Sequence, residues 1–263
     1  MRSNTIFWGT ILVLLGVLLL LSNMGIVTAN IWGIIWPIGL ILFGVWIILG
    51  LFLRRNLEVE QASIPLEGAS QASVRIGHAA GRLQIGSGAG PGNLLDGEFG
   101  GGVEIDKKRQ ADTLGVRLNP SQTWSFPFAW SPGDTLNWSL RLTNEVPLGL
   151  ELETGANDAR VDLTELKVTS LRLSSGASST DLTLPAVAGY TRVKISTGAA
   201  SVKVRVPQGV AASIHYSSGL ASVSVDKERF PRAERGYQST DYDLAQNKVD
   251  IEIETGVGSV EIG

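Results

Sequence analysis

The side chains best suited to metal binding or proton transfer are the two histidines, His78 and His215. A zinc site built from histidine alone needs three or four converging ligands, which two histidines cannot supply. The chain has no cysteine, which removes thiolate ligands, disulfides and cysteine nucleophiles together. His78 takes the corner position of a repeat described below, and His215 stands between two residues that are expected to face inward. We therefore predict neither a metal site nor a cofactor.

Three further patterns resemble catalytic or nucleotide-binding motifs only superficially. The glycine-rich stretch Gly86–Gly92 lacks the Lys-Ser/Thr pair that follows a phosphate-binding loop. The recurrent Ser-Gly pairs lack the G-x-S-x-G spacing of a nucleophile elbow. The carboxylate pairs Asp96/Glu98 and Asp241/Asp243 lie in predicted loops among other charged residues, without further support for a glycosidase pair. These patterns lead us to predict a protein that is not an enzyme.

The most distinctive cluster of side chains is aromatic. It lies within NPSQTWSFPFAWSPGDTLNW and comprises Trp124, Phe126, Phe128, Trp130 and Trp138. If these rings are exposed, they form a contact surface for a partner or a membrane. If they are buried, they cap the open end of a stack of repeats, which would otherwise expose apolar side chains and unpaired backbone. We predict the cap and keep the contact surface as the alternative.

The charged residues are unevenly distributed along the chain. No acidic residue precedes Glu58, and the only basic residues before it are Arg2, Arg54 and Arg55. The remaining 19 of the 22 basic residues stand against all 25 acidic ones, so this part of the chain carries a net charge of about −6. A domain of that sign repels phosphate backbones, and nucleic acid is therefore not a predicted partner.

Two uncharged apolar runs near the N-terminus are long enough to cross a membrane. They cover about 5–22 and 31–53, which is 18 and 23 residues, and a helix needs roughly 20 apolar residues to span a bilayer. The first run could instead be a signal peptide, but no cleavage pattern follows it and a second run begins eight residues later. Residues 1–56 are predicted to form a transmembrane hairpin in the lipid bilayer, and residues 57–67 a linker.

The basic residues also predict how the hairpin is oriented. The loop between the two runs has no Lys or Arg, whereas Arg2 precedes the first run and Arg54 and Arg55 follow the second. Because positive charge is retained on the cytoplasmic side, both ends of the hairpin are expected there. The chain is thus predicted to be a multi-pass membrane protein whose C-terminal domain lies in the cytoplasm.

The rest of the chain is a tandem repeat centred on a Ser/Thr-Gly pair. The repeated glycines are Gly155, Gly176, Gly198, Gly219 and Gly256, and a sixth copy has Ala79 in the place of glycine. The glycines are 21, 22, 21 and 37 residues apart. Apolar residues stand five and three positions before glycine and six after it, alternating with polar or small ones, which predicts strands with one buried face. Glycine is expected to supply a positive φ at a tight corner.

A unit of about 21 residues with two short strands cannot bury its apolar face alone, so the copies must stack. The regular spacing and the common inward face favour a β-solenoid over residues 68–263, in which each unit forms one coil and equivalent residues form ladders. The alternative is an antiparallel β-sandwich or meander with Ser-Gly hairpin turns. Two irregular insertions, at about 91–138 and 226–248, interrupt the period.

The two modules together resemble bacterial envelope proteins. FWGTILVLLGVLLLLSNMGIV and IWPIGLILFGVWIIL are similar to the LiaI/LiaF-like transmembrane region, and the repeats ending in IEIETGVGSVEIG resemble toast-rack and LiaF C-terminal β-domains. This resemblance implies a membrane-anchored all-β protein of the bacterial cell membrane, with a right-handed single-stranded β-helix and no catalytic residues. It also implies a non-enzymatic scaffold or regulator of the cell-envelope stress response, sometimes by restraint of a membrane sensor kinase. The alternative function is a structural solenoid that self-associates at the membrane.

Overall fold

The computed structural model describes residues 36–37, 39–41, 44, 59–121 and 136–263. The first three of these ranges are helical and belong to the second predicted span. The rest of both predicted spans, 5–22 and 31–53, lies outside the described residues. Within the described ranges, no helix has the length and apolar character that crossing a membrane requires. The chain divides into two compact units, residues 1–54 and 55–263, and the second is called the β-domain below.

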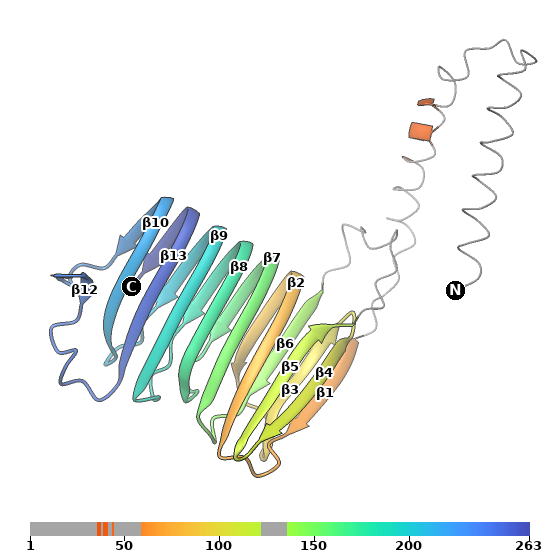
Figure 1. The fold of residues 1–263 in the computed structure, drawn as a ribbon, viewed down its shortest axis with the longest axis horizontal. Coiled ribbons are helices and arrows are strands. Elements are labelled where there is room, and N and C mark those ends of the chain that lie inside the picture. The colour runs from red at the N-terminus through yellow and green to blue at the C-terminus, as the bar shows by residue number, and fades with distance from the viewer. Residues whose placement is uncertain (1–35, 38, 42–43, 45–58, 122–135) are drawn as a thin grey trace, which may run out of the picture. The chain divides into compact units, whose positions relative to one another are not determined.

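The β-domain is a single sheet of thirteen strands within the described residues (Figure 1). The strands are β1 (Val59–Pro65), β2 (Gln71–Ser87), β3 (Asn93–Gly100), β4 (Val103–Gln110), β5 (Thr113–Pro120), β6 (Asn137–Leu142), β7 (Leu148–Asp162), β8 (Val168–Thr183), β9 (Tyr190–Arg205), β10 (Ala211–Val225), β11 (Arg232–Ala233), β12 (Gly236–Gln238) and β13 (Lys248–Ile262). This confirms the all-β class.

The six long strands contain one repeat each and lie parallel to one another. Their order in the sheet is β2, β7, β8, β9, β13 and β10, and Figure 1 shows them side by side. Equivalent residues of neighbouring repeats pair directly, as Leu152 does with Leu173 and Leu173 with Ile195. The predicted ladders are therefore present. Because all the pairs between repeats are parallel, the antiparallel sandwich is wrong for this part of the chain.

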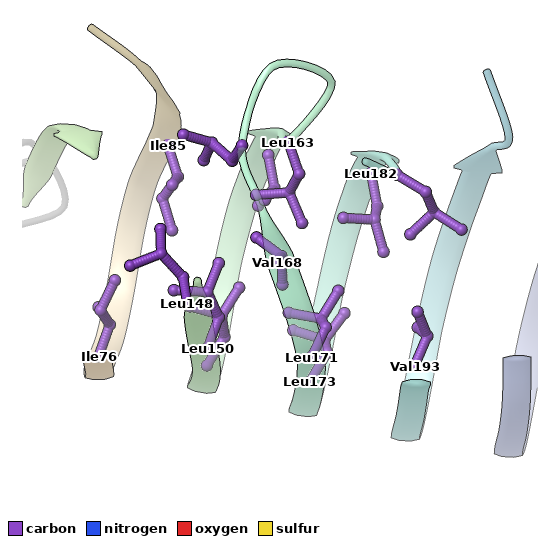
Figure 2. Close-up of a cluster of buried hydrophobic side chains, with 14 of the residues drawn as sticks. Ile76, Ile85, Leu148, Leu150, Leu163, Val168, Leu171, Leu173, Leu182 and Val193 are labelled. Carbon is purple, nitrogen blue, oxygen red and sulfur yellow. The ribbon is translucent and has the colours of Figure 1, made fainter. Parts of the chain in front are cut away.

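Each long strand turns back on itself within one coil. Only residues 184–189 separate β8 from β9, and only 206–210 separate β9 from β10. A straight strand would need a crossover of about a dozen residues to start a parallel neighbour, so the strand itself must bend. The bend lies at the Ser/Thr-Gly pair, and Leu173 before it and Leu182 after it belong to the same buried core. Figure 2 shows such residues in a row, with Leu150, Leu171 and Val193, which pair in register, following one another on neighbouring strands.

The coils do not stack in chain order. A stack in chain order would place β13 outside β10, but β13 lies between β9 and β10. Lys194 of β9 forms ion pairs with Glu252 and Glu254 of β13, with N–O distances of 3.3 and 3.0 Å. Surface pairs of this kind contribute little to stability, but they distinguish one neighbour from another. The 37-residue spacing before Gly256 supplies the chain length that this exchange needs.

Three segments between or before the repeats are more ordered than predicted. The linker 57–67 contains β1, which pairs with β3 and buries Ile64. The insertion at about 91–138 contains β3 and the antiparallel pair β4–β5. Its strands lack the Ser/Thr-Gly pair, so the repeat pattern alone does not identify them. The insertion at 226–248 contains the small β11–β12 hairpin and the fully buried Phe230.

Candidate functional site

The glycines of the repeats stack at the corner of the solenoid, but the predicted reason for them is wrong. None of the five repeated glycines has a positive φ. A Cβ atom added to Gly155 would lie 2.3 Å from the carbonyl oxygen of Ala79, and one added to Gly256 would lie 2.7 Å from that of Gly198. The backbone of the neighbouring coil occupies the space of a side chain. Glycine is therefore required for close stacking and not for an unusual φ.

On the outer side of this corner, the missing side chains leave a shallow open groove. Two adjoining hollows that share Ser196 follow the corner across the coils. Their walls are mostly glycine backbone, serine and threonine, together with the carboxylates Glu153 and Glu254. At the N-terminal end of the corner they also include His78, Ala79 and Pro120. Hydroxyl and peptide groups of this kind can hydrogen-bond a polar chain, but among the lining residues there is no nucleophile paired with a base. The groove therefore offers hydrogen-bonding groups to a polar chain.

On the inner side of the corner, the residue before each glycine contributes to a buried polar column. Its buried members are His78, Thr154, Ser175, Thr197 and Thr255. The hydroxyl of Thr197 donates to that of Thr255 at 3.0 Å, and the hydroxyl of Ser175 donates to that of Ser178 at 2.6 Å. Buried polar groups remain stable when they are paired in this way, so these paired hydroxyls allow the corner to close over the core. The buried hydroxyl of Thr154 has no hydrogen-bond partner among the described residues.

His78 occupies the N-terminal end of this column and is buried. Its Nε2 lies 3.1 Å from the carbonyl oxygen of Leu136, to which it must donate, and its Nδ1 has no hydrogen-bond partner among the described residues. Burial lowers the pKa of His78 from its usual 6.5, and the hydrogen bond to Leu136 opposes this only in part. His78 is thus a neutral core residue. His215 is exposed, as the alternation predicts, and lies at the other end of the stack, on β10.

The lowered pKa of His78 predicts a pH-dependent stability. Because the pKa of His78 is lower in the folded chain than 6.5, the unfolded chain takes up a proton at this position more readily as the pH falls through 6.5. The free energy of unfolding should therefore fall as the pH decreases from 6.5. His78→Gln keeps a side-chain N–H for Leu136 and does not titrate. Urea unfolding of the fragment 57–263 between pH 7 and pH 5 should show a smaller decrease for the variant. An equal decrease in both proteins would contradict this account of His78.

Of the predicted aromatic cluster, the structure describes Trp138 only. Trp138 lies on β6, where it pairs with Leu83 of β2 and Phe99 of β3. Its ring meets that of Phe99 edge-on at 5.0 Å and that of His78 at 5.2 Å, and its Nε1 donates to the Gly100 carbonyl at 3.3 Å. Only 1% of Trp138 is exposed, so it is a core residue.

The other four aromatic residues of the cluster, Trp124, Phe126, Phe128 and Trp130, lie outside the described residues. For them, the cap and the contact surface both stay predictions. Trp138 could have been separated from this group by sequence alone, because the run 136–142 alternates apolar and polar residues as a half-buried strand does.

Comparison with known families covers nearly the whole chain. The model of the N-terminal domain of toast_rack matches residues 54–205. The C-terminal domain of LiaF, described as a cell wall-active antibiotics response protein, matches residues 152–262. The LiaI-LiaF-like transmembrane region matches residues 6–48. Among curated proteins, none matches this chain.

Two solved structures are similar to the β-domain to different degrees. A proposed cell adhesion protein from Clostridium sporogenes superposes with a TM-score of 0.71 at 19% identity, over 78% of this chain and 98% of that one. A proposed adhesin from Bacteroides fragilis is 10% identical over 78% and 97% of the two chains, but its TM-score of 0.27 is too low to support a comparison. The first likeness establishes the fold alone. Because the toast_rack model matches more than half of the sequence, this chain belongs to the toast-rack family, with a LiaF-like C-terminal domain and a LiaI-LiaF-like transmembrane region.

Proposed function

We propose that this protein is a membrane-tethered, non-enzymatic scaffold that regulates the bacterial cell-envelope stress response. The observation that carries the proposal is the presence, in one chain, of a LiaI-LiaF-like transmembrane region and the LiaF-type domain of the cell wall-active antibiotics response. The partner is a membrane sensor kinase or another envelope protein, and the transmembrane hairpin keeps the β-domain close to it. The proposal also includes a right-handed winding of the coils in the β-domain, as the family resemblance implies.

The outer face of the β-domain supports a scaffold because its shape repeats while its charge varies. Four positions before the repeated glycine, successive coils of the sheet present Glu151, Arg172, Lys194 and Glu252. The backbone under these residues is held by parallel pairing to both neighbours, so their spacing is set by the sheet. A partner can therefore recognise the order of charges along a rigid surface, which favours specificity and rapid encounter more than tight binding.

The proposed orientation places the β-domain in the cytoplasm, where the catalytic part of a sensor kinase also lies. The support is the distribution of Arg2, Arg54 and Arg55 around an uncharged loop. The aromatic cluster at 124–130 is assigned to the cap, and its role as a partner contact is the alternative. An exposed cluster of this kind would bind through its rings, and a buried one would stabilise the stack.

One bait experiment tests the partner and the orientation together. The full-length chain is fused after Gly263 to a fluorescent protein that matures only in the cytoplasm, cross-linked in cells treated with a cell-wall antibiotic, and purified. We expect fluorescent cells and capture of a sensor kinase. Deletion of the gene should change the antibiotic-induced transcriptional response, and the unfused chain should restore it.

Dark cells with a correctly inserted fusion would contradict the orientation. A deletion strain with an unchanged antibiotic response would contradict the proposed function. A fusion that carries only residues 1–56 serves as the matched control, because it retains the membrane region and lacks the β-domain.

A further inference from the structure

The parallel stack ends at β10, and the outer edge of this strand is open. β10 pairs with β13 along its whole length, from Ala211 to Val225. On its other side, among the described residues, β12 pairs only with Ser213 and Ile214. From His215 to Val225, no neighbouring strand of the described chain meets the backbone groups on that side. Figure 1 shows β10 beside β13 at this end of the stack.

The opposite end of the stack is covered. The outer edge of β2 pairs with β5 over its first part and with β6 over its second part. β6 is followed in turn by β3 and β1. The two ends of the same stack are therefore built differently, and only the β10 end leaves a long stretch of strand without a neighbour in the described part of the chain.

The open edge of β10 lacks the features that usually protect such edges. Natural sheets place Lys, Pro or inward-pointing charges there, but the residues from His215 to Val225 include no Pro, Lys, Arg, Asp or Glu. Some of the equivalent outward positions on the interior coils are charged, as Lys203 of β9 and Glu261 of β13 are where β10 has Ser224. The outermost coil is thus the least charged. A coil that ends a stack in water is expected to have a polar outer face instead.

The core is also incomplete at this edge. Tyr216 continues the ladder of Ile195 and Ile253, which are fully buried, yet 41% of Tyr216 is exposed. Tyr237 of β12 stacks on Tyr216 with ring centroids 6.3 Å apart and covers it only in part. The last coil therefore presents apolar surface where another coil would fit.

The backbone of β10 points toward this edge in a regular pattern. The N–H and carbonyl of Ala212 face the open side, where they bond Ser239 at 2.9 Å, so even-numbered residues before the corner face outward from the stack. After the corner, the N–H of Asp226 donates to the carbonyl of Ile262 of β13. Even-numbered residues there face β13, so the odd-numbered ones direct their backbone groups to the open edge. The pairing with β13 skips Gly219, so the alternation changes from even to odd numbers at the corner. In each arm, the residues whose backbone groups point to the open edge are also those whose side chains face the core.

We propose that β10 pairs with β10 of a second copy of this chain, antiparallel, about a two-fold axis through the Gly219–Leu220 peptide. In this register Tyr216 lies opposite the partner's Val223, and Ser218 opposite the partner's Ala221. Each of these residues directs its backbone groups to the open edge and its side chain to the core, so the pairs can exchange both hydrogen bonds of an antiparallel ladder. The outward Ser217 lies opposite the partner's Ser222.

A second copy fits this edge better than an unrelated strand for two reasons. The two arms of β10 meet at a corner, and a two-fold axis through the corner places each arm on the other arm of the partner. The strand also brings no charge from Tyr216 to Val223, so no like charges meet in the contact. β12 of the β11–β12 hairpin already pairs with Ser213 and Ile214. The proposed pairing between copies is therefore confined to the eight residues from Tyr216 to Val223. The contact is isologous and therefore closes at two copies.

The absence of cysteine in the chain permits a register-specific test with the full-length protein in membranes. Ser217→Cys and Ser222→Cys are made in two chains with different tags and expressed together. Opposite residues of a non-hydrogen-bonded antiparallel pair have Cα atoms about 4.5 Å apart, within the range of a disulfide. Oxidation should therefore join the two tags. Ser217→Cys alone should give no dimer, because the two copies of residue 217 lie roughly 17 Å apart along the ladder.

The matched control is the pair Ser196→Cys and Ser201→Cys, which occupies the equivalent positions on the interior strand β9 and should not cross-link. Ser218→Lys added to both test chains places a charge opposite the partner's Ala221 and should abolish the disulfide, whereas the exposed Ser179→Lys on β8 should not. The proposal would be overturned if no disulfide joined the two tags, or if its yield only equalled that of the β9 pair. It would also be overturned if Ser218→Lys left the disulfide unchanged. Capture of a different protein by either introduced thiol, in place of the second copy, would do the same.

Discussion

Replacement of Ile195 by Asp is expected to unfold the β-domain, whereas Ser201→Asp on the same strand is expected to change its stability by less than about 0.5 kcal/mol. Ile195 is fully buried and lies in the ladder between Leu173 and Ile253. An aspartate there has no partner for its charge, and burial of an unpaired charge costs several kcal/mol. This approaches the total of about 5–15 kcal/mol for a typical domain.

The comparison between Ile195→Asp and Ser201→Asp isolates the direction of the side chain. Ser201 is exposed on β9 and lies between Ser179 and Ser259 in the sheet, so an added carboxylate there remains in water. Thermal unfolding of the fragment 57–263, followed by circular dichroism, measures both variants. Similar losses of melting temperature in the two variants would show that the assignment of inward and outward faces is wrong.

Replacement of Gly155 by Ala is expected to destabilise the β-domain strongly, and the same change at Gly176 only slightly. The new Cβ would lie 2.3 Å from the Ala79 carbonyl oxygen at the first position, and 3.3 Å from the Gly155 carbonyl oxygen at the second. Overpacking against backbone costs about 1–3 kcal/mol or more. A glycine-to-alanine change without strain gains about 0.4–1 kcal/mol from the unfolded chain, which offsets most of the cost at Gly176.

The same series predicts a rank order along the corner. Between these extremes the Cβ distances to the neighbouring carbonyl oxygen are 2.7 Å for Gly256, 2.9 Å for Gly219 on the outermost coil and 3.0 Å for Gly198. Melting temperatures should therefore decrease from Gly176→Ala through Gly198→Ala and Gly256→Ala to Gly155→Ala. For a domain of this size, 1 kcal/mol corresponds to roughly 2–4 °C, so the extremes are separable. Equal melting temperatures for all four variants would show that close stacking is not the reason for glycine.

The ladders could be predicted from the sequence because they depend only on local alternation. Leu173, Ile195 and Ile253 each stand three positions before a repeated glycine, and each faces the core. Tyr216 has the same position and is half-exposed, because its burial depends on which coil lies beside β10. That information is not local. Alternation predicts the face of a side chain, and the neighbour of the strand determines whether that face is covered.

The order of the coils could not be predicted because their apolar patterns are interchangeable. Ile214 and Ile251 occupy the same position in their repeats, so either could follow Val193 in the ladder. The outward residues distinguish the two coils, since β13 offers glutamates to Lys194 and Lys203 and β10 offers none. The glycine signal was similarly ambiguous. A positive φ and a close approach of neighbouring backbone both require glycine. Only the position of the next coil shows which of the two reasons applies.

The placement of β13 divides the β-domain into two topological regimes. β8 and β9 each pair with the coil formed about 21 residues earlier, so order can propagate from β7 to β9 as in a linear repeat array. From β9 onward this propagation stops, because the partners in the β9–β13 ladder are 58 residues apart, as Lys203 and Glu261 are. A longer loop must close before these contacts form. The domain is thus modular from β7 to β9 and non-local on both sides of this segment, because partners in the β2–β7 ladder, such as Arg75 and Glu151, are 76 residues apart. We therefore expect that a coil could be added or removed between β7 and β9 but not between β9 and β10.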